Sequence, residues 1–415
     1  MSLSTKKYSF TMLLVLLMYF SLAAQQIEVC NTCPIKTIAK AVSIANRHDV
    51  ILLKEGNYAE HDIVIDKPLS IHGEKNAVIN GEEKGYIFKV FADSVSIKGI
   101  TLKNVGRSYT KDYAAIYLSK SKYFTLENLL IENVFFGLLI EKSKHGIIKN
   151  NHIFSDAKVE ASSGNGIHLW DSSNVVIENN VVHNLRDGIY FEFVTNSKVI
   201  NNTSYDNLRY GLHFMFSNND EYHKNTFRNN GSGVAVMFSK FIKMTYNTFS
   251  ENWGTASYGL LLKEIYDAEI LHNVFEENTT GIKIEGTTRI NYFNNNFIRN
   301  GWALKVAGAC YSNIFKNNNF LHNSFDISYN SKLNDNSFDS NYWSDYTGYD
   351  LDKDGIGDVP YRPVKLFSYI VNQTPETVVL LRSLFVDIIN FSEKVSPAFT
   401  PDNLLDNNPL MRKNK

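Results

Sequence analysis

Short apolar segments alternate with polar ones along most of this chain and recur at a nearly constant interval. From about residue 86 the unit reads G-h-x-h-x-x-S-x-x-x-x-h-x-x-N-x-F, where h is an apolar residue. Short apolar alternation bounded by turn residues predicts β-strands. The first position of the unit recurs at intervals of 22, 29, 22, 23, 22, 26, 22, 22 and 23 residues, at Ala115, Gly137, Gly166, Gly188, Gly211, Gly233, Gly259, Gly281, Ala303 and Asp326.

A coil of 22–23 residues with three short strands is typical of a parallel β-helix. We therefore predict an all-β, right-handed parallel β-helix, with insertions at residues 155–165 and 251–258, where the interval lengthens. A leucine-rich repeat is the rival at this period, but its L-x-x-L-x-L frame is absent.

The asparagine that closes many units is expected to stack on its copy in the next coil. Asparagine tolerates a left-handed backbone at a turn and can hydrogen-bond to an identical neighbour. The predicted ladder consists of Asn151, Asn180, Asn202, Asn225, Asn247, Asn273, Asn295 and Asn318.

Helical spacing of apolar residues marks both ends of the chain. Residues 35–45 predict a short helix that covers the open end of the core, and residues 376–395 predict a second helix in the tail. We divide the chain into a signal peptide (1–24), an N-terminal cap with the first coils (25–85), the repeats (86–345), an Asp-rich loop (346–363) and a C-terminal tail (364–415). The last polar stretch, residues 406–411, is expected to be loosely held.

Hydrophobic content, net charge and the N-terminal segment limit the classes of protein to which this chain can belong. A hydrophobic content of 44% supports a large core, and a formal net charge of −1 argues against electrostatic binding to nucleic acid. Residues 1–24 have the form of a secretory signal, with Lys6 and Lys7 before an apolar run and SLAA at residues 21–24. The run is short for a spanning helix, so we expect cleavage and an exported, soluble protein.

Three cysteines are present, and two of them form a CxxC motif at Cys30 and Cys33. The third cysteine is Cys310. Because the number of cysteines is odd, at least one thiol lacks an intramolecular partner. The motif is compatible with a local disulfide, a redox pair or a soft-metal site.

One face of the predicted solenoid changes character in its middle. Strand alternation points His213 and Met215 outward, and Met237 follows on the next coil. Stacked strands lie about 4.8 Å apart, so the two methionines are expected to be neighbours. Two thioethers and an imidazole suit Cu(I). Alternatively, the insertion at residues 155–165 or the C-terminal tail covers this face, and its Met and Trp side chains only pack beneath the cover.

The preceding coils extend this face with four further residues, His168, Trp170, Tyr190 and Glu192, which we predict to meet a partner. A separate motif at residues 350–358 (DLDKDGIGD) has the start of a Ca²⁺ loop, with Asp350, Asp352, Asp354 and Asp358 as candidate ligands. Tyr361 stands where an EF-hand requires Glu, so the alternative is a solvated Asp-Gly turn.

An exported β-helix is also compatible with a carbohydrate-active enzyme. Such enzymes need carboxylates clustered on one face. The outward candidates, Asp171, Asp187 and Glu192, form no obvious adjacent pair, although Trp170 and Tyr190 could stack on sugar rings. A pure adhesion solenoid is a further alternative.

Five stretches of the chain belong together as a set: residues 65–69 (IDKPL) with Gly73 and Gly81, 209–219 (RYGLHFMFSNN), 233–237 (GVAVM), 341–346 (NYWSDY) with 358–361 (DVPY), and 408–411 (NPLM). Together they resemble the NosD family, periplasmic proteins that help to mature nitrous oxide reductase. The resemblance covers essentially the whole mature chain and is most specific in the H-x-M coil and the NYWSDY segment.

The resemblance implies a non-enzymatic accessory role outside the inner membrane. Family members work with an ABC permease, its cytoplasmic ATPase and a copper-chaperone lipoprotein, and help to load the copper–sulfide centre of nitrous oxide reductase. His213, Met215 and Met237 fall on the family's own motif. The apolar segment from about residue 364 is then expected to rest on the permease, which is the chain's link to the membrane. The Cys30/Cys33 pair is not part of the general family pattern.

Overall fold

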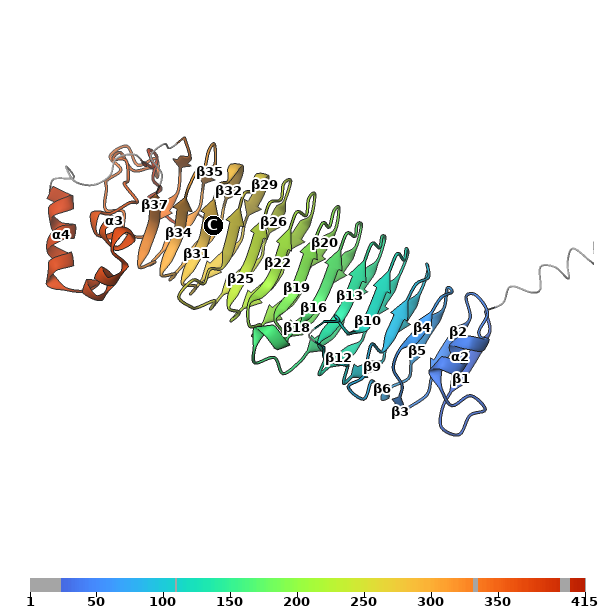
Figure 1. Cartoon of the computed structure of the whole chain (residues 1–415). Helices are drawn as coiled ribbons and strands as arrows, with labels where there is room; N and C mark the ends of the chain where they lie inside the picture. The colour runs from blue at the N-terminus through green and yellow to red at the C-terminus, as the bar shows by residue number, and fades with distance from the viewer. Residues whose placement is uncertain (1–23, 109, 331–334, 396–403, 415) are drawn as a thin grey trace, which may run out of the picture.

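The computed structural model describes residues 24–414 except 109, 331–334 and 396–403, so the predicted signal peptide lies almost entirely outside the described residues. The described chain winds into a long stack of coils with helices at its C-terminal end (Figure 1). Each regular coil gives one strand to each of three parallel sheets, of 14, 12 and 13 strands. The predicted all-β parallel β-helix is therefore confirmed.

Sheet A begins at the N-terminus of the described chain. Its strands are β1 (Gln26–Val29), β2 (Val50–Leu53), β5 (Ser70–Gly73), β8 (Ser96–Lys98), β11 (Thr125–Glu127), β14 (Ile147–Lys149), β17 (Val176–Glu178), β20 (Lys198–Ile200), β23 (Glu221–His223), β26 (Lys243–Thr245), β29 (Tyr266–Leu271), β32 (Thr288–Phe293), β35 (Ile314–Lys316) and β38 (Ser337–Asp339).

Sheet B holds the shortest strands. They are β3 (Gly56–Ala59), β6 (Ala77–Asn80), β9 (Thr101–Lys103), β12 (Leu130–Glu132), β15 (His152–Phe154), β18 (Val181–His183), β21 (Thr203–Tyr205), β24 (Thr226–Arg228), β27 (Thr248–Ser250), β30 (Val274–Glu276), β33 (Asn296–Ile298), β36 (Asn319–Leu321) and β39 (Tyr342–Trp343).

Sheet C carries the candidate site. Its strands are β4 (Ile63–Ile65), β7 (Phe88–Val90), β10 (Ala114–Ser119), β13 (Phe136–Glu141), β16 (Asn165–Trp170), β19 (Asp187–Glu192), β22 (Tyr210–Met215), β25 (Ser232–Met237), β28 (Leu260–Lys263), β31 (Thr280–Glu285), β34 (Trp302–Ala307) and β37 (Phe325–Asn330).

The inward side chains form continuous apolar columns through the stack. Phe249 and Phe275 lie 4.7 Å apart with nearly parallel rings, and the column continues through Phe297 and Phe320 to Trp343. All five rings are almost completely buried. Stacking identical positions coil on coil buries apolar surface and gives offset aromatic contacts, which together hold the solenoid.

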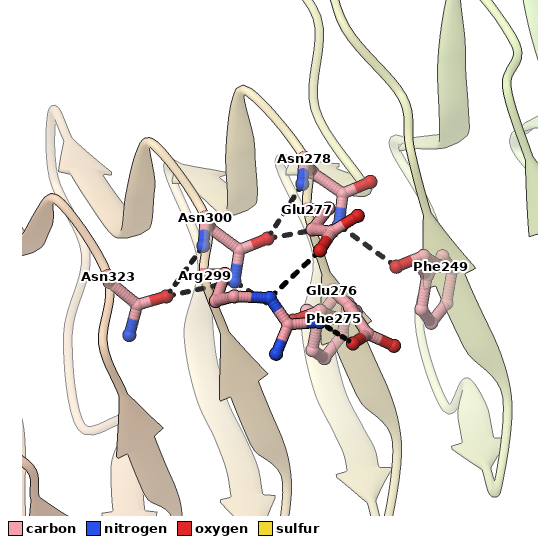
Figure 2. Close-up of polar contacts among 8 residues, drawn as sticks. All are labelled: Phe249, Phe275, Glu276, Glu277, Asn278, Arg299, Asn300 and Asn323. Carbon is pink, nitrogen blue, oxygen red and sulfur yellow. Dashed lines mark hydrogen bonds and ion pairs between the residues drawn. The ribbon is translucent and has the colours of Figure 1, made fainter.

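The predicted asparagine ladder is present and runs from Asn151 to Asn341, each side-chain amide donating to the next carbonyl at 2.9–3.1 Å. The left-handed residue, however, is the one before each ladder asparagine, such as Asn179 or Lys224. A second ladder, absent from the sequence prediction, includes Asn278, Asn300 and Asn323 (Figure 2).

The N-terminal cap is helix α2 (Ile38–Ile44), which buries Ile38, Ala41 and Val42 and confirms the predicted covering helix. Thr37 caps its start, and the Glu60 carboxylate accepts hydrogen bonds from the amides of Ile38 and Ala39. These contacts satisfy amides that the first turn leaves without partners.

The tail differs from the prediction of one helix over residues 376–395. It forms α3 (Leu366–Gln373), the 3₁₀ segment η2 (Pro375–Leu380) and α4 (Leu384–Val395). Pro375 ends α3 because it cannot continue a helix, and Arg382 adopts a left-handed backbone before α4. Phe367 and Val386 pack with Trp302 and Phe325 of the last coils.

The final residues are not loosely held as expected. Asp406 is fully buried, and one of its carboxylate oxygens accepts hydrogen bonds of 3.0 Å from the backbone and side-chain amides of Asn341 and from the Trp343 indole. Bridges also join Leu410 to Tyr342. The end of the chain therefore returns to close the asparagine ladder.

Candidate functional site

The outward side chains of β16, β19, β22 and β25 form one surface, here called the Met/His face: His168, Trp170, Tyr190, Glu192, His213, Met215 and Met237. Met215 is the direct partner of Met237, and Glu192 and Lys263 flank the pair in the same column. The expected neighbourhood of the two methionines is confirmed. Both are half-buried.

His213 points out of the solenoid but is only 7% exposed, which differs from a freely exposed outward residue. The rings of Tyr210 and Tyr190 lie 4.8 and 5.0 Å from its ring. Neither ring nitrogen has a hydrogen-bond partner within the described part of the chain. An imidazole buried without partners costs folding free energy, which is a common sign of a functional position.

Burial keeps His213 neutral. It lowers the pKa of the imidazole to about 4, with Arg209 and Arg186 opposing protonation and Asp187 favouring it. A neutral imidazole offers a lone pair for a metal without first losing a proton. At neutral pH this side chain is thus ready to act as a ligand.

An ion pair between a buried carboxylate and a half-buried guanidinium lies beside this face. Asp187 is completely buried and accepts two hydrogen bonds from the Arg209 guanidinium. The pairing raises the pKa of Arg209, and its cation also lies over the Tyr210 ring at 5.1 Å. Arg209 therefore holds Tyr210 against His213 while its charge is compensated by Asp187.

The four predicted partner-binding residues lie together at one end of the face. His168 is adjacent to Tyr190 and Trp170 to Glu192. All four are half-buried: Asn165 approaches His168, and the Lys142 ammonium lies over the Trp170 ring at 4.8 Å. Burial lowers the pKa of His168 to about 3 and raises that of Tyr190 to about 12.

The insertion at residues 251–258 forms one wall of an open cleft of about 840 Å³ beside the methionines. Met237, Tyr210, Trp253 and Tyr258 line the cleft, and Glu160 of the other insertion reaches its edge. Burial and a hydrogen bond with Tyr210 raise the pKa of Tyr258. The insertions thus partly cover the face, yet leave Met237 accessible from the cleft.

A row of exposed phenylalanines borders the methionines and was missed by the sequence prediction. Phe193, Phe216 and Phe238 directly follow Glu192, Met215 and Met237, stack with centroids 5.2 and 5.1 Å apart, and are 47%, 38% and 43% exposed. Each has a left-handed backbone, a strained choice for an aromatic residue. Their spacing of 23 and 22 residues was the available signal.

The Asp-rich loop brings together three of its four predicted Ca²⁺ ligands. Oxygens of Asp350, Asp352 and Asp354 lie within 4.8 Å of one another. Asp358 instead accepts a hydrogen bond from the Leu351 amide, and Asp350 accepts those of Asp354 and Gly355. Calcium binding stays a prediction for this loop.

The two cysteines of the CxxC motif, Cys30 and Cys33, form a disulfide. The pairing removes the two thiolates that a metal site at this position requires, so the metal interpretation of the motif is corrected in favour of the disulfide. Cys310 is a buried free cysteine.

The carboxylates considered for sugar chemistry are dispersed. Asp187 is committed to Arg209, Glu192 accepts a hydrogen bond from Tyr190, and Asp171 lies exposed at a turn. Glycoside cleavage needs two carboxyl groups flanking one bond. This arrangement does not favour the carbohydrate-active alternative.

The fold and the half-covered outward face define the chain as a parallel β-helix whose sheet C carries paired thioethers beside an imidazole. The profile of the family described as periplasmic copper-binding protein (NosD) matches residues 154–348. A probable ABC transporter binding protein NosD from Pseudomonas aeruginosa is 31% identical over 385 residues, 87% of each chain, and its counterpart from Stutzerimonas stutzeri is 30% identical over 87% of this chain and 86% of its own. The chain belongs to the NosD family.

Solved structures show the same fold at low identity. The surface adhesin PfbA of Streptococcus pneumoniae matches with a TM-score of 0.56 and 14% identity, over 70% of this chain and 86% of its own. The periplasmic alginate epimerase AlgG matches with a TM-score of 0.53 and 12% identity, over 70% and 76%. Across the described residues, none of the helices has the length and apolar character needed to cross a membrane.

Proposed function

We propose that this protein is a periplasmic accessory component of an ABC transporter that receives Cu(I) on the Met/His face during maturation of the copper centre of nitrous oxide reductase. The observation that carries the proposal is the direct pairing of Met215 with Met237 near His213, a buried histidine whose ring nitrogens have no hydrogen-bond partner among the described residues. The family description and the relatives' names support the setting.

The ligand set fits the cargo. Thioethers are soft, neutral ligands that select Cu(I) over harder ions. His213 is neutral at pH 7, and the charge of the nearby Arg209 is compensated by Asp187. Because Met237 lines the open cleft, an ion can arrive and leave without unfolding the coil. Reversible access is what delivery, as opposed to storage, requires.

The surroundings supply surfaces for partners. The exposed Phe193, Phe216 and Phe238 row, with the half-buried His168 and Trp170, offers a place for the copper-chaperone lipoprotein or nitrous oxide reductase. The helical tail offers an apolar surface for the permease. We propose no reaction on this chain itself; ATP hydrolysis belongs to the cytoplasmic ATPase. Whether sulfur accompanies copper is a further point for experiment.

The test is titration of the mature protein with Cu(I) against a competing chelator, for the wild type and for M215L/M237L/H213L. Leucine keeps the volume of each side chain close to its original value and removes the ligand atom. We expect tight binding in the wild type and its loss in the triple variant. Met411→Leu, a half-buried methionine far along the chain, serves as the matched control.

Absence of Cu(I) binding to the wild type would overturn the proposal for this chain and would assign the metal to the partners. Equal binding by wild type and triple variant would place the copper elsewhere on the chain.

A further inference from the structure

Two histidines on sheet B form a pair that plays no part in the Met/His face. His152 lies on β15 and His183 on β18 of the next coil, and their Nε2 atoms are 2.9 Å apart. His183 is the direct partner of Phe154, so His152 approaches it diagonally across the two coils. Sheet B is a different wall of the solenoid from sheet C.

The distance between the two nitrogens matches a shared metal ion. Imidazole nitrogens bind first-row ions at about 2.0–2.1 Å. With both Nε2 atoms at that distance from one ion, a separation of 2.9 Å corresponds to a nitrogen–metal–nitrogen angle of about 90°. That is the angle between adjacent ligands in the tetragonal sites of Cu²⁺ and Ni²⁺.

The His183 ring is held on both faces, whereas the His152 ring has one further ring contact, with Phe154 at 5.0 Å. The His183 ring is sandwiched between Phe154 and Tyr205, with centroids 5.1 and 4.6 Å away and nearly parallel planes. His152 is exposed, and its ring is tilted by 40° from that of His183. A rotation of His152 can therefore turn its lone pair from the neighbouring nitrogen towards an ion held by both.

The electrostatic setting of His183 favours its neutral form. Partial burial and the second imidazole lower the pKa of His183, while the Asp206 carboxylate acts in the opposite direction. Arg228, the nearby cation, lies over the Tyr205 ring at 5.5 Å and forms an ion pair with Glu251. The two Nε2 atoms and the nearby Asp206 carboxylate thus offer a setting that suits a divalent cation.

We infer that His152 and His183 form a surface site for a divalent transition-metal ion of the Cu²⁺/Ni²⁺ class, with the remaining positions open to water or to a ligand from another molecule. The site lies on sheet B, whereas the proposed Cu(I) face lies on sheet C. It offers imidazole nitrogens and no thioether, and it suits a harder ion than Cu(I). Its existence does not depend on the proposed function.

The test is isothermal titration of the mature, tag-free protein with Ni²⁺ alone, because thioethers bind this ion poorly. We expect one site in the wild type and at least about tenfold weaker binding, equivalent to 1.4 kcal/mol, in H152A and H183F. Phenylalanine at position 183 keeps the ring between Phe154 and Tyr205, so the coil should remain intact, which a thermal melt verifies.

Two controls make the outcome decisive. His145→Ala removes an exposed histidine that also stacks on a tyrosine, at 5.2 Å from Tyr123, but is not in the pair; His213→Leu alters the Cu(I) face. Both should bind Ni²⁺ like the wild type. If H152A and H183F keep wild-type affinity, or if the wild type shows no Ni²⁺ site, the inference is wrong, whatever the Cu(I) titration gives.

Discussion

At the scale of single residues, His213 combines features that folding alone does not favour. Its ring is buried, both nitrogens lack partners among the described residues, and its pKa is depressed. Leaving a buried polar group unsatisfied costs about 1–3 kcal/mol. A core evolved only for stability would place an apolar side chain at this position.

We therefore expect His213→Leu to raise the thermal midpoint at pH 7.5, by an amount equivalent to about 1 kcal/mol, while weakening Cu(I) binding. Differential scanning calorimetry and the chelator titration measure the two effects on the same sample. Phe214→Leu, an inward neighbour whose change opens a cavity, should lower the midpoint instead. A destabilised His213→Leu protein would show that the imidazole has a structural role.

At the scale of elements, the sequence predicts the structure best where the same contact repeats from coil to coil. The 22–23-residue period identified the coils, and strand alternation placed Met215 beside Met237. The sequence predicts less of the structure where segments that are distant along the chain come into contact. Residues 251–258 form the cleft wall beside Met237, and Asp406 meets Asn341 across 65 positions, so no local pattern records either contact. Arg382, whose backbone is left-handed, likewise interrupts the predicted helix, and the spacing of the apolar residues does not indicate this interruption.

Helix α4 exposes an apolar stripe at helical spacing, with Leu384, Ile388 and Phe391 being 74%, 55% and 68% exposed. Its other side, through Val386, packs on the last coils. We propose that the stripe binds the permease. L384S/I388S/F391S should abolish co-purification with the permease and leave Cu(I) affinity unchanged, whereas Leu351→Ser, an equally exposed leucine at 77%, should change neither. Retained co-purification would exclude the stripe as the contact.

At the scale of the whole molecule, the buried histidines couple the stability of the fold to pH. The pKa values of His213 and His168 are lowered to about 4 and about 3. Below about pH 6.5, the ordinary imidazole pKa, both histidines take up a proton in the unfolded chain but not in the folded chain. Their contribution to the free energy of unfolding therefore has its full value above about pH 6.5 and decreases as the pH falls towards 4. Asp326, whose pKa burial raises to about 7, acts in the opposite direction.

A comparison of variants isolates the histidine contribution. When the pH falls from 7.5 to 5, each of the two histidines should lower the free energy of unfolding of the wild type by about 2 kcal/mol. The H168F/H213L variant lacks both imidazoles and should not show this loss. The thermal midpoint of the double variant should therefore fall several degrees less over this range. Parallel midpoint curves for the two proteins would show that neither imidazole is held neutral by the fold.

The return of residues 404–411 to the last coil bears on how the protein forms after export. A chain that emerges N-terminus first can close α2 over the first coil and then add one coil at a time, each templated by the edge before it. The last edge stays open until Asp406 arrives to satisfy Asn341 and Trp343. We therefore expect residues 404–411 to complete the fold last, and a chain truncated before them to keep an unpaired strand edge that can pair with another chain.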